Sequence, residues 1–112
     1  MRRLALLGST GSIGTSTLDV VEAHPDRLQL VALAAGRNRE RFLQQCLRFR
    51  PTCVSLAHAE DAQWLREQLP YAPEIHHGPE GLQACALHGD ADTLVAAVVG
   101  AAGLASTEAA LR

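Results

Sequence analysis

The chain has 112 residues, of which 47% are hydrophobic and 20% charged, the profile of a globular domain with one core. No apolar run is long enough to cross a membrane. The apolar stretch after the two N-terminal arginines is too short for a signal peptide, because the sequence GSTG interrupts it. We therefore expect a cytoplasmic protein that binds no membrane.

Charge is distributed unevenly, although the net charge is only −2. Residues 1–50 contain eight arginines and four acidic residues, whereas residues 51–112 contain two arginines and eight acidic residues. A basic half within an acidic chain favours a small polyanion over nucleic acid, and most of the arginines also fit solvated helix faces. Because the chain has no lysine, a catalytic lysine within it is excluded.

Neither the cysteines nor the histidines have the spacing of a metal site. Cys46, Cys53 and Cys85 are far apart and form no CxxC pair, which is typical of core residues. The adjacent His76 and His77 would point to opposite faces of a strand. We expect no metal ligands in this chain.

Strands and helices alternate in the first half of the chain. Residues 4–8 form a short apolar run that ends in glycine, as buried parallel strands do. Residues 12–23 are predicted to be an amphipathic helix. The apolar face of that helix is expected to contain Ile13, Thr17, Val20 and Val21.

The alternation continues with a strand over 28–36, a helix over 37–50, a strand over 52–57 and a helix over 59–69. The first of these helices has its apolar residues at Phe42, Leu43, Cys46, Leu47 and Phe49. The second has them at Trp64, Leu65 and Leu69.

The second half of the chain repeats the pattern more weakly. A short strand is predicted over 74–77, a helix over 80–88, a strand over 93–100 and the beginning of a helix over 104–112. Alternation of this kind predicts an α/β fold, a doubly wound (Rossmann-type) parallel sheet with helices on both faces. Because the pattern stops within its last helix, residues 1–112 are interpreted as one truncated dinucleotide-binding domain.

A glycine-rich turn joins the first strand to the first helix. Gly8, Gly11 and Gly14 have the spacing GxxGxxG, one residue longer than the common GxGxxG motif. In a βαβ unit, such a turn lets the backbone approach a diphosphate, which the helix N-terminus attracts. A tight turn that binds no ligand remains the alternative. The lack of GK[ST] excludes a nucleoside-triphosphate loop.

The end of the second strand indicates which dinucleotide would bind. Proteins that bind NAD have an acidic residue at the end of the second strand, where it binds the ribose 2′-hydroxyl. The second strand of this chain ends with Ala35 and Gly36 instead. Arg37 follows, and a guanidinium can pair with a 2′-phosphate, with Asn38 and Arg39 as further donors. This favours NADP(H) over NAD(H), unless Arg37 only begins a solvated helix.

The small residues of VVGAAGL, at 98–104, follow the last predicted strand. In a doubly wound sheet this loop faces the glycine-rich turn across the switch point, where a nicotinamide could pass close to the backbone. The small residues are explained equally well by a tight turn that only the packing of the sheet requires.

Three segments together resemble the N-terminal part of 1-deoxy-D-xylulose 5-phosphate reductoisomerases: LGSTGSIGTSTLDVV at 7–21, VALAAGRN at 31–38 and VVGAAGL at 98–104. The resemblance covers essentially the whole chain and implies an NADPH-binding domain. The residues that it implies for the cofactor are Gly8, Thr10, Gly11, Ser12 and Ile13 at the diphosphate, Gly36, Arg37 and Asn38 at the 2′-phosphate and ribose, and Ala101 and Ala102 near the nicotinamide.

The resemblance also implies an activity for the intact enzyme. Members of the family rearrange 1-deoxy-D-xylulose 5-phosphate and reduce it with NADPH to 2-C-methyl-D-erythritol 4-phosphate, a step toward isoprenoid precursors. They use Mg²⁺ or Mn²⁺ and are homodimers. The catalytic and metal-binding segments of the family would follow Arg112, so we expect no catalytic residue and no metal ligand here, and no turnover by this chain alone.

Two other functions fit the GxTGxxG turn. A semialdehyde or acyl-phosphate reductase would need a catalytic cysteine in a later segment, which Cys46, Cys53 and Cys85 fit poorly. A non-catalytic module that senses dinucleotides is the other alternative, because a fold alone does not prove an activity.

Overall fold

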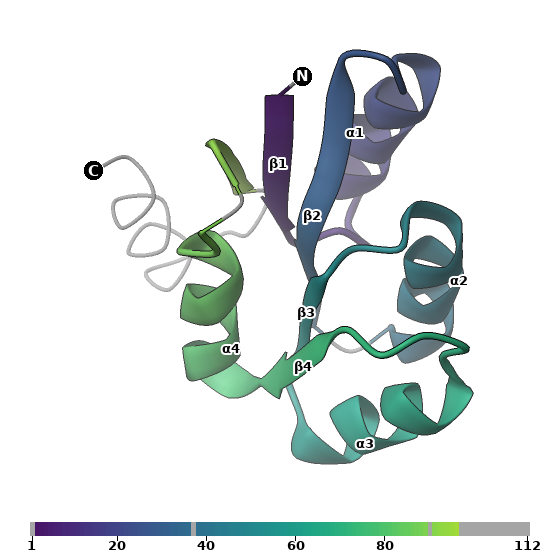
Figure 1. The fold of residues 1–112 in the computed structure, drawn as a ribbon. Coiled ribbons are helices and arrows are strands. Elements are labelled where there is room, and N and C mark those ends of the chain that lie inside the picture. The colour runs from purple at the N-terminus through teal and green to yellow at the C-terminus, as the bar shows by residue number, and fades with distance from the viewer. Residues whose placement is uncertain (1, 37, 90, 97–112) are drawn as a thin grey trace.

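The computed structural model describes residues 2–36, 38–89 and 91–96, which form a single sheet covered by helices (Figure 1). The strands are β1 (Arg2–Leu7), β2 (Leu28–Ala34), β3 (Cys53–Leu56), β4 (Glu74–His77) and β5 (Thr93–Ala96). The helices are α1 (Ser12–Ala23), α2 (Arg39–Phe49), α3 (Ala59–Gln68) and α4 (Gly78–Ala86).

The strands are all parallel and lie in the order β4-β3-β2-β1-β5. The chain first moves outward from β1 to β4, so right-handed crossovers place α1, α2 and α3 on one face. It then returns past β1 to form β5, which places α4 on the opposite face (Figure 1). This confirms the doubly wound fold, and the reversal of direction lies between β1 and β5.

The predicted elements are present, with ends that differ by a few residues. The second helix was predicted from residue 37 but begins at Arg39, because Asn38 is its N-cap and its Oδ1 accepts a hydrogen bond from the Arg41 amide at 3.3 Å. The helix predicted over 104–112 and the last part of the strand predicted over 93–100 lie outside the described residues.

The two faces of the sheet carry side chains of different size. Toward α1, α2 and α3 the core contains large residues, among them Leu6, Leu33 and Phe42, each with an exposed fraction of 0%. Toward α4 the buried strand residues are mostly small: Ala5, Ala32, Ala34 and Cys53, with Leu7 as the large member of this cluster. Because successive strand residues alternate between faces, this difference lets α4 approach the sheet closely.

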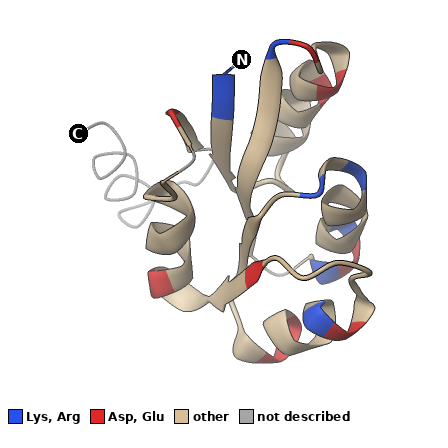
Figure 2. Ribbon diagram, viewed as in Figure 1, with Lys and Arg blue, Asp and Glu red and all other residues tan. Residues whose placement is uncertain are grey.

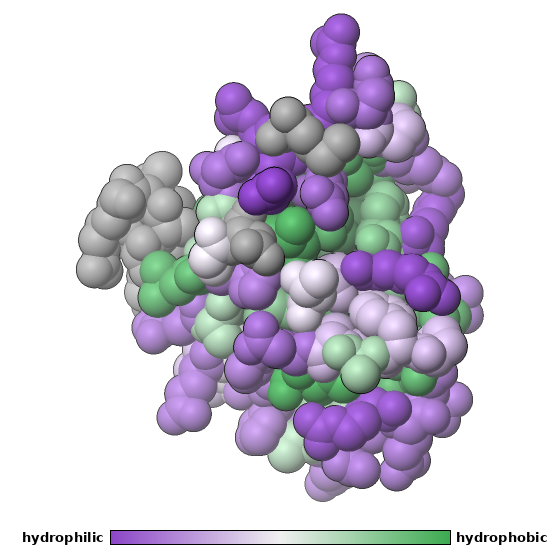
Figure 3. Space-filling model, viewed as in Figure 1, coloured by the Kyte–Doolittle hydropathy of each residue, from purple (hydrophilic) through white to green (hydrophobic). Residues whose placement is uncertain are grey.

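Charged residues lie mainly on the helices, in the turns and at strand ends, and the middle of the sheet is uncharged (Figure 2). Hydrophobic side chains are visible between the hydrophilic ones over the middle of the same view (Figure 3). No helix in residues 2–36, 38–89 and 91–96 has the length and hydropathy to span a membrane.

The buried face of α1 differs from the predicted one. Gly14, Leu18 and Val21 face the sheet, whereas Ile13 and Val20 are 64% and 53% exposed. The prediction was correct for Val21 but wrong for Ile13 and Val20, because the helix backbone at Gly14 packs directly on the preceding turn. A glycine adds nothing to a hydrophobic pattern, so the pattern alone selected the neighbouring face.

The faces of α2 and α3 agree better with the prediction. Phe42, Cys46 and Leu65 are buried, and Trp64 packs half-buried against the same core. The predicted residues Leu43, Phe49 and Leu69 are also partly buried against this core. Leu47 is 38% exposed, so its assignment to the apolar face was wrong.

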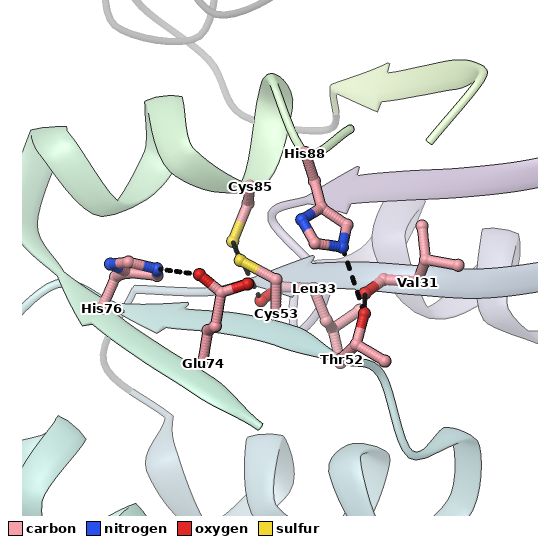
Figure 4. A network of polar contacts seen from close by, with 8 residues as sticks. All are labelled: Val31, Leu33, Thr52, Cys53, Glu74, His76, Cys85 and His88. Atoms are coloured by element: carbon pink, nitrogen blue, oxygen red, sulfur yellow. Dashed lines mark hydrogen bonds and ion pairs between the residues drawn. The ribbon is translucent and has the colours of Figure 1, made fainter. Parts of the chain in front are cut away.

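The three cysteines are buried and free, which agrees with the core role predicted for them. Cys53 in β3 and Cys85 in α4 lie with their sulfur atoms 3.6 Å apart, and the Cys85 thiol donates to the Leu33 carbonyl oxygen at 3.7 Å (Figure 4). The hydrogen bond to Cys53 and burial raise the pKa of Cys85. This thiol is therefore neutral at ordinary pH and joins α4 to the sheet.

Candidate functional site

The turn after β1 lies at the carboxyl edge of the sheet and is bound to the end of β2. The amides of Gly8 and Ser9 both donate to the Ala34 carbonyl oxygen, at 2.8 and 3.0 Å. Gly8 has a φ of 82°, a left-handed conformation that favours glycine. The amide of Gly11 donates back to the Gly8 carbonyl oxygen at 3.3 Å. The turn is therefore held at several points before α1 begins.

The three glycines of the turn have different structural roles. A Cβ on Gly14 would lie 2.1 Å from the Gly8 carbonyl oxygen and 2.7 Å from the Ser9 Cα, which no side chain can occupy. A Cβ on Gly11 would lie 3.6 Å from the same oxygen, an ordinary contact. Gly8 is thus needed for its backbone conformation and Gly14 for close packing, whereas Gly11 leaves the N-terminus of α1 uncovered.

The N-terminus of α1 presents amide groups that no side chain of the described residues caps. Gly11 is the N-cap, and the first amide bonded along the helix is that of Thr15, which donates to the Gly11 carbonyl oxygen at 2.9 Å. The preceding amides, from Ser12 to Gly14, have no carbonyl one turn earlier within the helix. The first turn contains no acidic residue. These features make the helix end attractive to an anion.

A cleft of about 250 Å³ lies beside the turn, where β1, β2 and β3 end and α4 begins. Its walls include Gly8, Gly36, Leu56 and Pro79 and are mainly apolar. A Cβ added to Gly36 would meet no atom within 4 Å, so the cleft is open at that position. The site thus combines an anion-binding helix end with an adjoining apolar cleft.

The structure brings most of the predicted site residues to this edge. Gly8 and Gly36 line the cleft, Thr10 is half-buried in the turn, and Ser12 and Ile13 are exposed in the first turn of α1. Asn38 is exposed and caps α2, so its side-chain oxygen is already engaged. The remaining predicted residues, Arg37, Ala101 and Ala102, lie outside the described residues.

Two buried polar residues lie beneath the turn, and sequence reasoning missed one of them, Gln45. Ser9 has an exposed fraction of 0%, and its carbonyl oxygen accepts a hydrogen bond from the Gln45 side chain at 2.9 Å. Gln45, in α2, is 8% exposed. The signal that could have revealed it is position, because Gln45 falls on the same helix face as Phe42 and Cys46, which are both buried.

The described residues hold no cluster suited to a metal ion: in 2–36, 38–89 and 91–96 no three His, Cys, Asp or Glu side chains lie close enough together. The alternative of a reductase with a nucleophilic cysteine also gains no support, since Cys46, Cys53 and Cys85 are all buried. Burial raises the pKa of Cys46 to about 12, so its thiol is a poor nucleophile.

The sheet order and the uncapped turn at its carboxyl edge define a Rossmann-like α/β domain. Comparison with known families then identifies the family to which this domain belongs. The family model for 1-deoxy-D-xylulose 5-phosphate reductoisomerase matches residues 4–112. The chain therefore belongs to the 1-deoxy-D-xylulose 5-phosphate reductoisomerase family.

Curated members of the family are similar along the whole chain. The 1-deoxy-D-xylulose 5-phosphate reductoisomerase of Geobacter metallireducens is 56% identical over 113 aligned positions, which cover 100% of this chain and 29% of that protein. The enzyme of Nitratidesulfovibrio vulgaris is also 56% identical, with 99% of this chain and 28% of that protein covered. The chain thus spans between a quarter and a third of the length of these relatives.

Solved structures show the same fold. A crystal structure of DOX-P reductoisomerase in complex with NADPH, fosmidomycin and magnesium matches with a TM-score of 0.91 and 37% identity, over 98% of this chain and 28% of that one. The enzyme from Zymomonas mobilis in complex with NADPH matches with a TM-score of 0.89 and 38% identity, over 98% of this chain and 29% of that one.

Proposed function

We propose that this chain binds NADPH and is the cofactor-binding domain, over residues 1–112, of a 1-deoxy-D-xylulose 5-phosphate reductoisomerase. The observation that carries the proposal is the uncapped N-terminus of α1, which lies beside the end of β1 and the apolar cleft. Related structures contain NADPH. The first turn of α1 has no acidic residue to repel the diphosphate of this cofactor.

The diphosphate would bind at the amides of Thr10, Gly11, Ser12 and Ile13, with hydroxyl donors from Thr10 and Ser12. Main-chain amides at a helix end stabilise such a group through both hydrogen bonds and the helix dipole. Gly8 and Gly36 would let the cofactor lie close to the strand ends, because neither residue places a side chain in the cleft.

The adenosine end would be recognised by Gly36, Arg37 and Asn38. No acidic residue follows β2 until Glu40, so the residues directly after the strand place no negative charge beside a 2′-phosphate. Arg37 would bind it through a charge-assisted pair, and the Asn38 amide nitrogen would add a donor. On the nicotinamide side we propose Ala101 and Ala102.

The intact protein would rearrange 1-deoxy-D-xylulose 5-phosphate and reduce it to 2-C-methyl-D-erythritol 4-phosphate, with hydride supplied by NADPH. We propose that it acts in the cytoplasm as a homodimer and uses Mg²⁺ or Mn²⁺, since a related structure contains magnesium. The catalytic groups and metal ligands would come from segments outside this chain, so this chain alone would bind cofactor without turnover.

Binding titrations of the chain with NADPH and NADH test the proposal. We expect NADPH to bind at least about tenfold more tightly, since a charge-assisted pair to the 2′-phosphate is worth about 1.5–3 kcal/mol. Arg37→Glu should reverse this ranking. Arg66→Glu, the same charge change at an exposed position of α3, is the control and should leave the ranking unchanged. Equal affinities for the two cofactors, or none for a folded chain, would contradict the assignment.

A further inference from the structure

The turn that would receive the diphosphate rests on one buried side chain from another helix. Gln45 in α2 donates through Nε2 to the Ser9 carbonyl oxygen at 2.9 Å, and the contact is buried. Ser9 is fully buried and Gln45 is 8% exposed. A buried carbonyl needs a partner, and in the described part of the chain this oxygen has none besides Gln45.

The Ser9 carbonyl and the Thr10 amide belong to the same peptide group. The described peptide bonds include no cis form, so the C=O and N–H of this planar unit point in opposite directions. A hydrogen bond that fixes the Ser9 oxygen therefore also fixes the Thr10 N–H, which points away from Gln45. Within the described residues the Thr10 N–H has no acceptor, which is what an amide that binds a ligand requires.

Other contacts of the turn do not restrain this peptide group. The amides of Gly8 and Ser9 hold the preceding peptides to the Ala34 carbonyl oxygen, and the Gly11 amide returns to Gly8. Close packing of Gly14 limits the position of the Ser9 Cα. Rotation of the peptide between Ser9 and Thr10 is opposed by the Gln45 hydrogen bond.

We propose that Gln45 is a positioning residue for the cofactor site: it orients the Thr10 amide toward the diphosphate by binding the Ser9 carbonyl oxygen. This inference rests on the proposed function. Because the diphosphate is common to NADPH and NADH, Gln45 acts on affinity for both cofactors and leaves the preference between them unchanged. A residue at the 2′-phosphate, such as Arg37, changes the preference itself.

The first experiment compares Gln45→Met with Gln44→Met, an exposed neighbour in the same helix, by titration of the folded chain with NADPH and NADH. Methionine matches the length of glutamine but cannot donate. We expect Gln45→Met to bind both cofactors about tenfold more weakly, the usual effect of one lost buried hydrogen bond. Gln44→Met should bind as the wild type does.

The second experiment separates positioning from a merely structural role. In Gln45→Glu, a protonated carboxyl can donate to the Ser9 oxygen, whereas an ionised one cannot. Burial raises the pKa of such a carboxyl, so the donor should return as the pH falls from about 8 to about 5. We expect the affinity of Gln45→Glu for NADPH to recover at least about fivefold over this range, relative to wild type and to Gln44→Glu.

Charged groups that line the groove beside Gln45 are Asp19 from α1 and Arg41 and Arg48 from α2. All three are present in wild type and in both glutamate variants, so their direct effects on the cofactor are common to the three proteins. The two guanidinium groups lower the pKa of a carboxyl at position 45 and burial raises it, so the affinity is followed down to about pH 5. Thermal unfolding at each pH shows that the variants remain folded during the titrations.

The outcomes are distinct. If the folded wild type binds no NADPH, the proposed function fails and this inference fails with it. If wild type binds but Gln45→Met binds equally well, or Gln45→Glu follows the wild-type pH profile, only the positioning role is overturned. Should Gln45→Met not fold, the pH series decides alone, because it compares Gln45→Glu with wild type and with Gln44→Glu at each pH.

Discussion

Gly14 in α1 and Gly8 at the end of β1 approach so closely that a Cβ on Gly14 would lie 2.1 Å from the Gly8 carbonyl oxygen. Both partners of this contact are backbone, so neither can move aside as a flexible side chain would. The contact fixes the start of α1 against the turn and thereby the direction in which its first amides point.

Gly14→Ala should therefore destabilise the fold by about 2 kcal/mol or more, because the added methyl group displaces the turn. The loss should occur although alanine favours a helix over glycine by about 1 kcal/mol. Gly11→Ala is a matched control, since its Cβ would lie 3.6 Å from the same oxygen. Urea denaturation measures both variants, and equal stabilities would contradict the packing described here.

A second close contact joins α4 to β3. A Cβ on Gly81 would lie 2.0 Å from the Ser55 Oγ and 3.0 Å from its Cβ. We expect Gly81→Ala to destabilise the chain by about 1–3 kcal/mol. Because the obstructing atoms belong to a side chain, Ser55→Gly should restore part of this loss. A double-mutant cycle measures the coupling, and strictly additive effects would argue against direct contact.

Arg39 links α2 to α3 through two contacts. Its guanidinium lies 4.6 Å from the centroid of the Trp64 ring and 3.3 Å from the Asp61 carboxylate. Arg39→Met should lower the free energy of unfolding by about 1 kcal/mol, since the pair is partly exposed. Arg41→Met, at an exposed position of the same helix, should have a smaller effect. Fluorescence of Trp64, the one tryptophan of the sequence, reports unfolding.

Alkaline pH should weaken the fold through its buried thiols. Burial raises the pKa of Cys46 to about 12 from its usual value near 9. Between these values the unfolded chain releases this proton and the folded chain keeps it, so the free energy of unfolding falls as pH rises above about 9. One proton contributes up to about 1.4 kcal/mol per pH unit. The pH slope for Cys46→Ala, from denaturation at several pH values, should be shallower than that of wild type; identical slopes would show that Cys46 ionises alike in both states.

Much of the fold could be predicted from the sequence because the strands are short apolar runs that end at glycines or turns. The edge strand at 74–77 was found from only four residues, EIHH between turn residues. The face of α1 was found only in part, at Val21, because a backbone contact at Gly14 also determines it and hydrophobicity does not record such contacts.

The location of the candidate site also followed from the glycine spacing. The buried side chain that holds the turn in place, Gln45, did not. Gln45 is polar, and polar residues are usually interpreted as solvent-facing, so nothing in the pattern connected α2 with the turn after β1. The contact between the thiols of Cys53 and Cys85 could not be predicted either, because it depends on α4 lying on the opposite face of the sheet from the other helices. Long-range relationships of this kind arise from topology rather than from local composition.

The position of β1 between β2 and β5 has a consequence for biosynthesis. One edge of β1 pairs with β2, but the other pairs with β5, whose residues Thr93–Ala96 leave the ribosome much later. Until then the nascent chain has an unpaired strand edge in its interior, which is prone to pairing with other chains. Chaperone contact with the free edge of residues 2–7 during translation would protect this intermediate until β5 pairs with β1.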